Sequence, residues 1–511
     1  MEFLLIYLLI FIPVVSAFLT FILSGRLPRI LTTTLFSISM LAIVFLLGRF
    51  IILWGEINIY GERISIAAEW VIKLINLGLC IVFFIIAVNV KKFSIAIIAL
   101  IQLSLLTLLE TDIFGRMKTG GLVFTLNFKM VVLISIVILF GIFIAFAFSR
   151  SNGKLLRAEK KSLAYGIRFP LIFLMISSVC GIILSDNLIW MLCFWEILTI
   201  CIYIITNIDN SNNMKEYAIK VLRINLLGGT IFISATILIF MCIGNVSISN
   251  IVAESVNQPL TIAIGLMCLA IFIRSGLFPY IYHDIKSSDV QYKLINISSI
   301  VIPNFAAIYL LLRISVFLDQ PIQSRTVAAA GAILFLGYSF MSLISGYISR
   351  SGYYCVMSNL SIILCIISLR KDFFEWTVFI LLGYSIFLSL LLYVFQKYRN
   401  KKRKNQLLNS FSMILYISIC VFINVFIAKI FALSPFYYTF VIPACALNTI
   451  YIINSIAFLL NNNLNKAEEN RESLSRYINF EIFSRIDERK CSIILNVAEF
   501  AVFAIMIGVI L

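Results

Sequence analysis

Long apolar stretches separated by short polar breaks recur along almost the whole chain. Each is about 20 residues long, enough for a helix to cross the hydrocarbon core of a bilayer. None alternates polar and apolar residues as the strands of a membrane β-barrel do. The pattern predicts an all-α polytopic membrane protein with about 14 to 16 transmembrane helices. The predicted spans lie near 3–24, 28–54, 67–90, 93–110, 126–149, 167–184, 187–206, 219–243, 259–282, 294–316, 326–347, 354–369, 374–396, 407–433, 436–460 and 492–511.

The apolar run at the start of the chain, over 3–24, is predicted to be the first of these spans. It lacks a positively charged start, and its apolar core is too long for a signal peptide. A basic segment over 149–169 interrupts the series of apolar runs, and we predict it to be a linker between two groups of helices.

Composition and charge agree with a membrane protein. Of the 511 residues, 62% are hydrophobic and 13% are charged. The loops on one side of the predicted spans carry 25 Lys and Arg, and the alternate loops carry 6. Cytoplasmic loops carry such an excess, so we expect a multi-pass protein of the cytoplasmic membrane, with both termini outside and the large basic loops in the cytoplasm. The net charge of +16 is then a topology signal beside anionic lipid, and it does not indicate a nucleic-acid partner.

Cysteine and histidine usage argues against a bound metal. Eleven Cys are scattered, mostly within apolar runs, no two form a CxxC pair, and the chain has one His. Zinc, haem and iron–sulfur groups need clustered ligands of these types. We therefore expect buried structural thiols, no metal and no cofactor in this chain. The chain also has no recognisable redox or hydrolytic site of its own.

Ionisable residues inside apolar spans are the candidates for function, because a charge at membrane depth is costly and usually marks an ion path. Glu196 lies near the middle of its span and is preceded by Trp195. Lys220 opens the next span, with Arg223 three residues on and on the same helix face. An interfacial Glu and a topology-setting positive flank are the alternatives to a functional role for these residues.

The ninth span combines Arg274 with Gly276 and Pro279. Pro removes a backbone donor and Gly permits unusual dihedral angles, so this combination predicts a broken helix with a cation at the break. Transporters use such breaks on their ion paths. The alternative is an Arg neutralised by a carboxylate, Glu196 included. We expect Glu196 to share a polar cavity with Lys220 or Arg274. Arg313, near the end of the tenth span, is expected to snorkel to the membrane surface.

Several motifs resemble one family of membrane subunits. The resemblance rests on Arg168–Phe169, on Ser185–Asp186–Asn187 followed by Trp195–Glu196, on AIKVLRINLLGG and FIRSGLFP, and on RSGYYCVMSNLS over 350–361. These pieces are similar to the antiporter-like subunits of respiratory complex I, of energy-converting membrane-bound hydrogenases and of multisubunit cation/proton antiporters. The likeness covers roughly residues 65–395, and AAEWVIKLINLGL and LIQLSLLTLLE look most like the hydrogenase-type complexes.

The resemblance implies two inverted five-helix repeats with broken helices, and translocation of protons or Na⁺ along a line of Glu, Lys and His. Glu196 matches the essential Glu of the family, Lys220 the Lys of the next helix, and Arg274 the Lys of the central broken helix. The implied organisation is N-terminal helices over 1–150, an antiporter-like core over 151–400, and C-terminal helices over 401–511 with a basic cytoplasmic loop over 461–490.

Departures from the family pattern fall in the second half of the relay. Arg274 keeps the charge of the family's Lys but cannot release a proton, because the pKa of arginine lies above about 12. Ser299 stands where the next helix of the family has a His, and Phe305 where a Lys follows. In the span 374–396, Tyr384 and Leu388 stand where the family has a His and a Lys.

Three functions therefore remain open. The first is an ion-translocating membrane subunit of a complex I-like, NADH–quinone oxidoreductase type or hydrogenase complex, driven by a soluble redox module and assembled with other membrane subunits. The second is a structural scaffold that has lost conduction. The third is a subunit of a cation/proton antiporter or of an inorganic-carbon uptake system.

Overall fold

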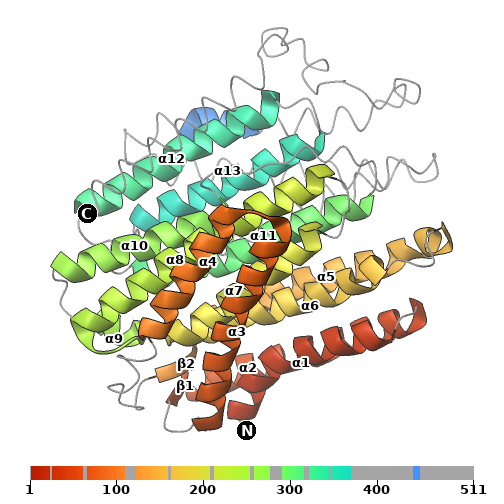
Figure 1. Cartoon of the computed structure of the whole chain (residues 1–511), viewed down its shortest axis with the longest axis horizontal. Coiled ribbons are helices and arrows are strands. Elements are labelled where there is room, and N and C mark those ends of the chain that lie inside the picture. Colours follow the sequence, from red (N-terminus) through yellow and green to blue (C-terminus); the bar gives the residue numbers. More distant parts are fainter. Residues whose placement is uncertain are drawn as a thin grey trace.

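The computed structural model describes residues 2–23, 26–60, 66–109, 122–158, 163–207, 212–253, 258–276, 290–315, 321–344, 348–369 and 441–448. Helices make up nearly all of these residues (Figure 1). They are α1 Glu2–Ile22, α2 Arg26–Trp54, α3 Ile66–Val90, α4 Phe93–Leu108, α5 Phe128–Ala158, α6 Leu163–Leu184, α7 Leu188–Asn207, α8 Asn212–Ile243, α9 Ile248–Ala253, α10 Gln258–Arg274, α11 Val290–Ile314, α12 Pro321–Ile344 and α13 Ile348–Leu369.

The long helices coincide with the first twelve predicted spans, which confirms an all-α polytopic membrane protein. Within the described ranges, seven helices are long and apolar enough to cross a membrane, and five shorter apolar helices accompany them. The four spans predicted beyond residue 370 lie outside the described residues, apart from the helical stretch 441–448. The inverted-repeat organisation therefore stays a prediction.

Three features differ from the sequence-based expectation. The segment predicted as a linker over 149–169 is mostly helical, because α5 continues to Ala158 and α6 begins at Leu163. A short helix, α9, follows α8. The segments β1 Ile57–Tyr60 and β2 Leu122–Leu126 form a two-stranded antiparallel sheet, with Ile57 opposite Leu126. Strands of four or five residues give too short a pattern to be distinguished inside loops.

The helices pack as a layered bundle around α6, α7 and α8. Helix α1 lies along α6, α6 packs on α7, α7 on α8, and α8 on α10, while α11 contacts α5, α6, α7 and α10. Figure 1 shows the α12–α13 pair on one side of the bundle and α1 with α2 on the other. Helices α3 and α4 pair with each other and lie against α7 and α8. The helices before residue 150 thus contact the segment that carries Glu196.

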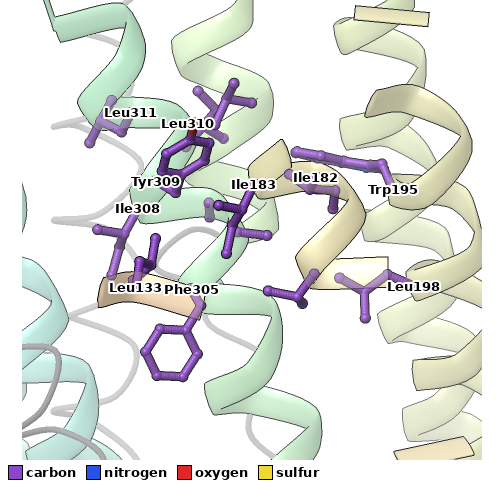
Figure 2. Close-up of a cluster of buried hydrophobic side chains, with 14 of the residues drawn as sticks. Leu133, Ile182, Ile183, Trp195, Leu198, Phe305, Ile308, Tyr309, Leu310 and Leu311 are labelled. Atoms are coloured by element: carbon purple, nitrogen blue, oxygen red, sulfur yellow. The ribbon is translucent and has the colours of Figure 1, made fainter. Parts of the chain in front are cut away.

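The centre of this bundle is apolar. Figure 2 shows Phe305 and Tyr309 of α11 in the same buried cluster as Ile183 of α6 and Trp195 of α7. Phe305 is 1% exposed, and its ring lies 6.3 Å from that of Phe140. Close packing of this kind leaves little room for water or for an unpaired charge.

A polar corner fixes the start of α7. Between α6 and α7, the backbone N–H of Asp186 donates to the carbonyl of Val123 at 2.7 Å, and its carbonyl accepts from the N–H of Ile248 at 2.9 Å. The fully buried Asp186 carboxylate accepts hydrogen bonds from the hydroxyls of Ser247 and Ser249, the latter at 2.8 Å. The corner therefore ties β2, the α8–α9 connection and α7 together.

Arg313 of α11 completes this corner. Its Nη2 forms an ion pair with the Asp186 carboxylate, and its Nη1 donates to the Ser185 carbonyl at 3.0 Å. The Arg313 side chain is only 13% exposed. The expectation that Arg313 snorkels was wrong, because the buried carboxylate and carbonyl offer its guanidinium better acceptors than the surface.

Candidate functional site

Glu196 lies in the apolar interior of the bundle. It is the ninth residue of the 20-residue α7, so at about 1.5 Å per residue it sits near the middle of a span. The residue is 1% exposed. Its Oε1 accepts a hydrogen bond from Nε2 of Gln102 at 2.7 Å, whereas its Oε2 has no hydrogen-bond partner among the described residues. A buried carboxyl with one unpartnered oxygen is uncommon in a folded protein and needs an explanation.

Arg274, the last residue of α10, is the cation of the site. Its Nη1 donates to Oγ1 of Thr199 at 2.7 Å and to Oδ1 of Asn225 at 3.0 Å. Its Nη2 donates to the carbonyl of Trp195 at 2.9 Å, and its Cζ lies 4.8 Å from the centre of the Trp195 ring. The guanidinium is thereby held against α7 and α8 and is 3% exposed.

The charges of Glu196 and Arg274 interact electrostatically, although the two described side chains form no direct ion pair. Arg274 binds the residue before Glu196 and the residue three positions after it. In an interior of low dielectric, such charges act on each other more strongly than in water. The structure therefore brings together Glu196 and Arg274, one of the two pairings expected from the sequence.

The helix that carries Arg274 ends at the position where the sequence predicts a break. Helix α10 ends at Arg274, and the chain turns through Ser275 to Gly276, whose φ is +68°. This left-handed conformation is strained for a residue with a Cβ. Pro279 lies outside the described residues.

Lys220 and Arg223 are not part of this buried site. Both side chains are exposed on α8, whereas Asn225 and Gly229 of the same helix face α7. The pairing of Glu196 with Lys220 is therefore not seen. The reason is the helical periodicity of α8. Lys220 lies five positions and Arg223 two positions before Asn225, so both fall on other faces of the helix.

The remaining candidate positions offer no titratable group among the residues described. Ser299 lies in α11, where the structure describes its backbone alone. Phe305 packs in the apolar cluster of Figure 2. Tyr384 lies outside the described residues, as does Leu388.

Sequence reasoning did not single out Gln102, Thr199 or Asn225 as site residues. Each is an uncharged polar residue in an apolar run, and this is the one signal that could have found them. Gln102 is fully buried in α4, whose other buried residues are Ile95, Ala99 and Leu106. A buried amide in such a helix needs a hydrogen-bonding partner, and here the partner is Glu196.

The fold and the buried Glu–Arg site define an antiporter-like membrane subunit. Residues 185–465 match the family described as NADH:quinone oxidoreductase/Mrp antiporter, TM. The match covers more than half of the 511-residue chain, and the chain therefore belongs to this family. Gln102 lies outside the matched residues.

Two solved structures share the fold. One is described as the membrane-bound sulfane sulfur reductase (MBS), an archaeal respiratory membrane complex. A chain of it aligns with a TM-score of 0.66 and 13% identity over 99% of both chains. The other is the Mrp complex from Dietzia sp. DQ12-45-1b, with a TM-score of 0.57 and 15% identity over 86% of this chain and 55% of that one. No curated protein sequence matches the chain.

The family and these neighbours agree on the type of protein. The chain is a membrane subunit of the kind found in complex I-like and Mrp-type ion-translocating complexes. Both neighbours come from multisubunit membrane complexes, which supports other membrane subunits as partners.

Proposed function

We propose that the chain translocates protons, with Na⁺ as the alternative ion, as the membrane subunit of a complex I-like or energy-converting hydrogenase complex. The observation that supports this most directly is Glu196. Its carboxyl is buried near the middle of a span, has one unpartnered oxygen, and lies within the electrostatic influence of a fixed cation. Such a group can bind and release a proton or coordinate a small cation.

Arg274 contributes charge rather than proton transfer in this proposal. Arginine keeps its proton at any working pH, so its position sets how easily Glu196 carries a negative charge. If the two charges moved apart, their attraction would weaken, because Coulomb energy falls with distance. Movement of the α10 end relative to α7 would thus couple conformation to ion exchange.

The experiment that tests this proposal is transport by Glu196→Gln in inverted membrane vesicles containing the assembled complex. The electron donor of the redox partner drives transport, a pH-sensitive dye reports protons, and ²²Na⁺ uptake reports sodium. Glu216→Gln is the matched control, because Glu216 is exposed on α8. We expect Glu196→Gln to abolish transport and Glu216→Gln to leave it unchanged. Coupled transport that persists in Glu196→Gln would overturn the proposal.

The partners and orientation belong to the same proposal. Electron transfer in a soluble module would supply the energy, the protein would lie in the cytoplasmic membrane with both termini outside, and the basic loops would face the cytoplasm. Affinity purification of the chain with its bound subunits tests this. Co-purified redox subunits would support ion translocation driven by electron transfer. Antiporter subunits would favour a cation/proton antiporter, and a soluble zinc protein would favour an inorganic-carbon uptake system.

A second candidate, a non-conducting scaffold of such a complex, is favoured by Phe305. A relay residue there would need water or a polar partner, but Phe305 is 1% exposed and packs among apolar side chains. The two candidates predict different results in the same vesicles. If the chain is a scaffold, the wild type shows no ion transport through it. Glu196→Gln should then assemble and support electron transfer as the wild type does.

A further inference from the structure

Helix α4 supplies the one side chain that is hydrogen-bonded to Glu196 among the residues described. Nε2 of Gln102 donates to Oε1 of Glu196 at 2.7 Å, across 94 positions of sequence. Gln102 is fully buried. Helix α4 is held in place by its packing on α3 and α8, where Ile95, Ala99 and Leu222 belong to one apolar cluster.

The two oxygens of Glu196 have different surroundings. Oε1 accepts the hydrogen bond from Gln102 and lies close to the backbone of Gly229. A Cβ placed on Gly229 would lie 2.3 Å from Oε1 and 3.4 Å from Nε2 of Gln102. Real Cβ atoms do not approach an oxygen so closely, so only glycine at 229 leaves room for this hydrogen bond. Oε2 has no hydrogen-bond partner among the described residues.

An amide suits this position because it does not titrate. It donates a directed hydrogen bond to a carboxylate without neutralising its charge, whereas a Lys in the same place would compete with the transported ion. The bond also fixes the rotation of the carboxyl group about its last torsion, which is otherwise broad and roughly two-fold. Because Gln102 holds Oε1, Oε2 is the oxygen that remains available to bind and release the ion.

We propose that Gln102 is a positioning residue of the ion-translocation site: it holds Oε1 of Glu196 beside Gly229 and so makes Oε2 the oxygen that binds and releases the ion. This inference rests on the proposed function of Glu196. It also gives the helices before the family-matched segment a direct part in the site, through α4.

The test is infrared difference spectroscopy of the purified complex, combined with the vesicle transport assay. The carboxyl bands of Glu196 are assigned by their disappearance in Glu196→Gln. Gln102→Met keeps the length and volume of the side chain but cannot donate. Ser104→Ala is the control on the same helix, because the Ser104 side chain is exposed and its hydroxyl bonds only the Ile101 carbonyl.

We expect Gln102→Met to shift the Glu196 carboxyl bands, as loss of a hydrogen bond does, and to lower the transport rate about tenfold, the effect of losing roughly 1.4 kcal/mol from a bond to a charged group. Ser104→Ala should leave both unchanged. An unshifted Glu196 band in Gln102→Met would overturn the proposal, and so would a shifted band with wild-type transport.

Gly229→Ala tests the same contact if Gln102→Met does not assemble. It retains the amide but displaces Oε1, so it should shift the same band. Failure of the two proposals can be distinguished. Normal transport in Glu196→Gln refutes the function of Glu196, whereas an unshifted band refutes the role of Gln102 and leaves that function standing.

Discussion

Replacing Arg313 by Leu removes the cation that faces a fully buried carboxylate. Asp186 is 0% exposed, and its ion pair with Arg313 joins α11 to the α6–α7 corner. Breaking a buried pair by removing one partner costs about 3–5 kcal/mol, because the remaining charge stays uncompensated. Ser247 and Ser249 still donate to Asp186 in the variant. We therefore expect a loss at the lower end, about 3 kcal/mol of unfolding free energy.

The assay is unfolding of the purified protein by titration with SDS, with the thermal midpoint in mild detergent as a second measure. Asp186→Asn combined with Arg313→Leu removes both charges and should recover about half of the loss, because Asn still accepts from the serines. Arg49→Leu is the control, because Arg49 is exposed on α2 and its replacement should change stability by no more than about 0.5 kcal/mol. If Arg313→Leu lowers the unfolding free energy no more than Arg49→Leu does, then Arg313 reaches the membrane surface and its ion pair with Asp186 does not stabilise the corner.

Two further predictions concern helix packing and the site cation. Gly331→Ala should destabilise the protein by about 1–3 kcal/mol in the same titration, because its Cβ would lie 2.7 Å from the backbone nitrogen of Cys365 in α13. Gly78→Ala, in open space on α3, should be neutral or stabilising by up to about 1 kcal/mol, and equal effects would refute the close α12–α13 contact. Arg274→Gln should lower vesicle transport at least tenfold, whereas Arg274→Lys keeps the charge and should retain transport with a lower thermal midpoint. Equal transport in both variants would mean that the charge of Arg274 is not used.

The positions of the membrane helices could be predicted from the sequence because the signal is local. A run of about 20 apolar residues is sufficient to identify a span, and neither its neighbours nor its register need be known. The same local signal identified Glu196 and Arg274, since a charged residue in an apolar run stands out wherever the helix is placed. The interruption after Arg274 was predictable as well, because Gly276 and Pro279 follow within five residues.

The contacts of the site could not be predicted in this way, because they depend on helix rotation and on distant partners. Lys220 is also a charged residue, at the start of an apolar run, but the rotation of α8 decides that Asn225 faces inward and Lys220 outward. Gln102 carries no charge to mark it. Arg313 and Asp186 lie 127 positions apart, each near a span end where an exposed side chain is the default expectation.

Arg274 also changes how the departure from the family pattern is understood. A Lys at this position would present one compact ammonium, whereas the acceptors here are spread for a planar guanidinium: Thr199 and Asn225 on Nη1, and the Trp195 carbonyl on Nη2. The Trp195 ring covers the guanidinium face, an arrangement that favours Arg over Lys. The surroundings of Arg274 thus fit a permanent cation. In the proposed function, Arg274 keeps its proton and Glu196 is the group of this site that would carry the ion.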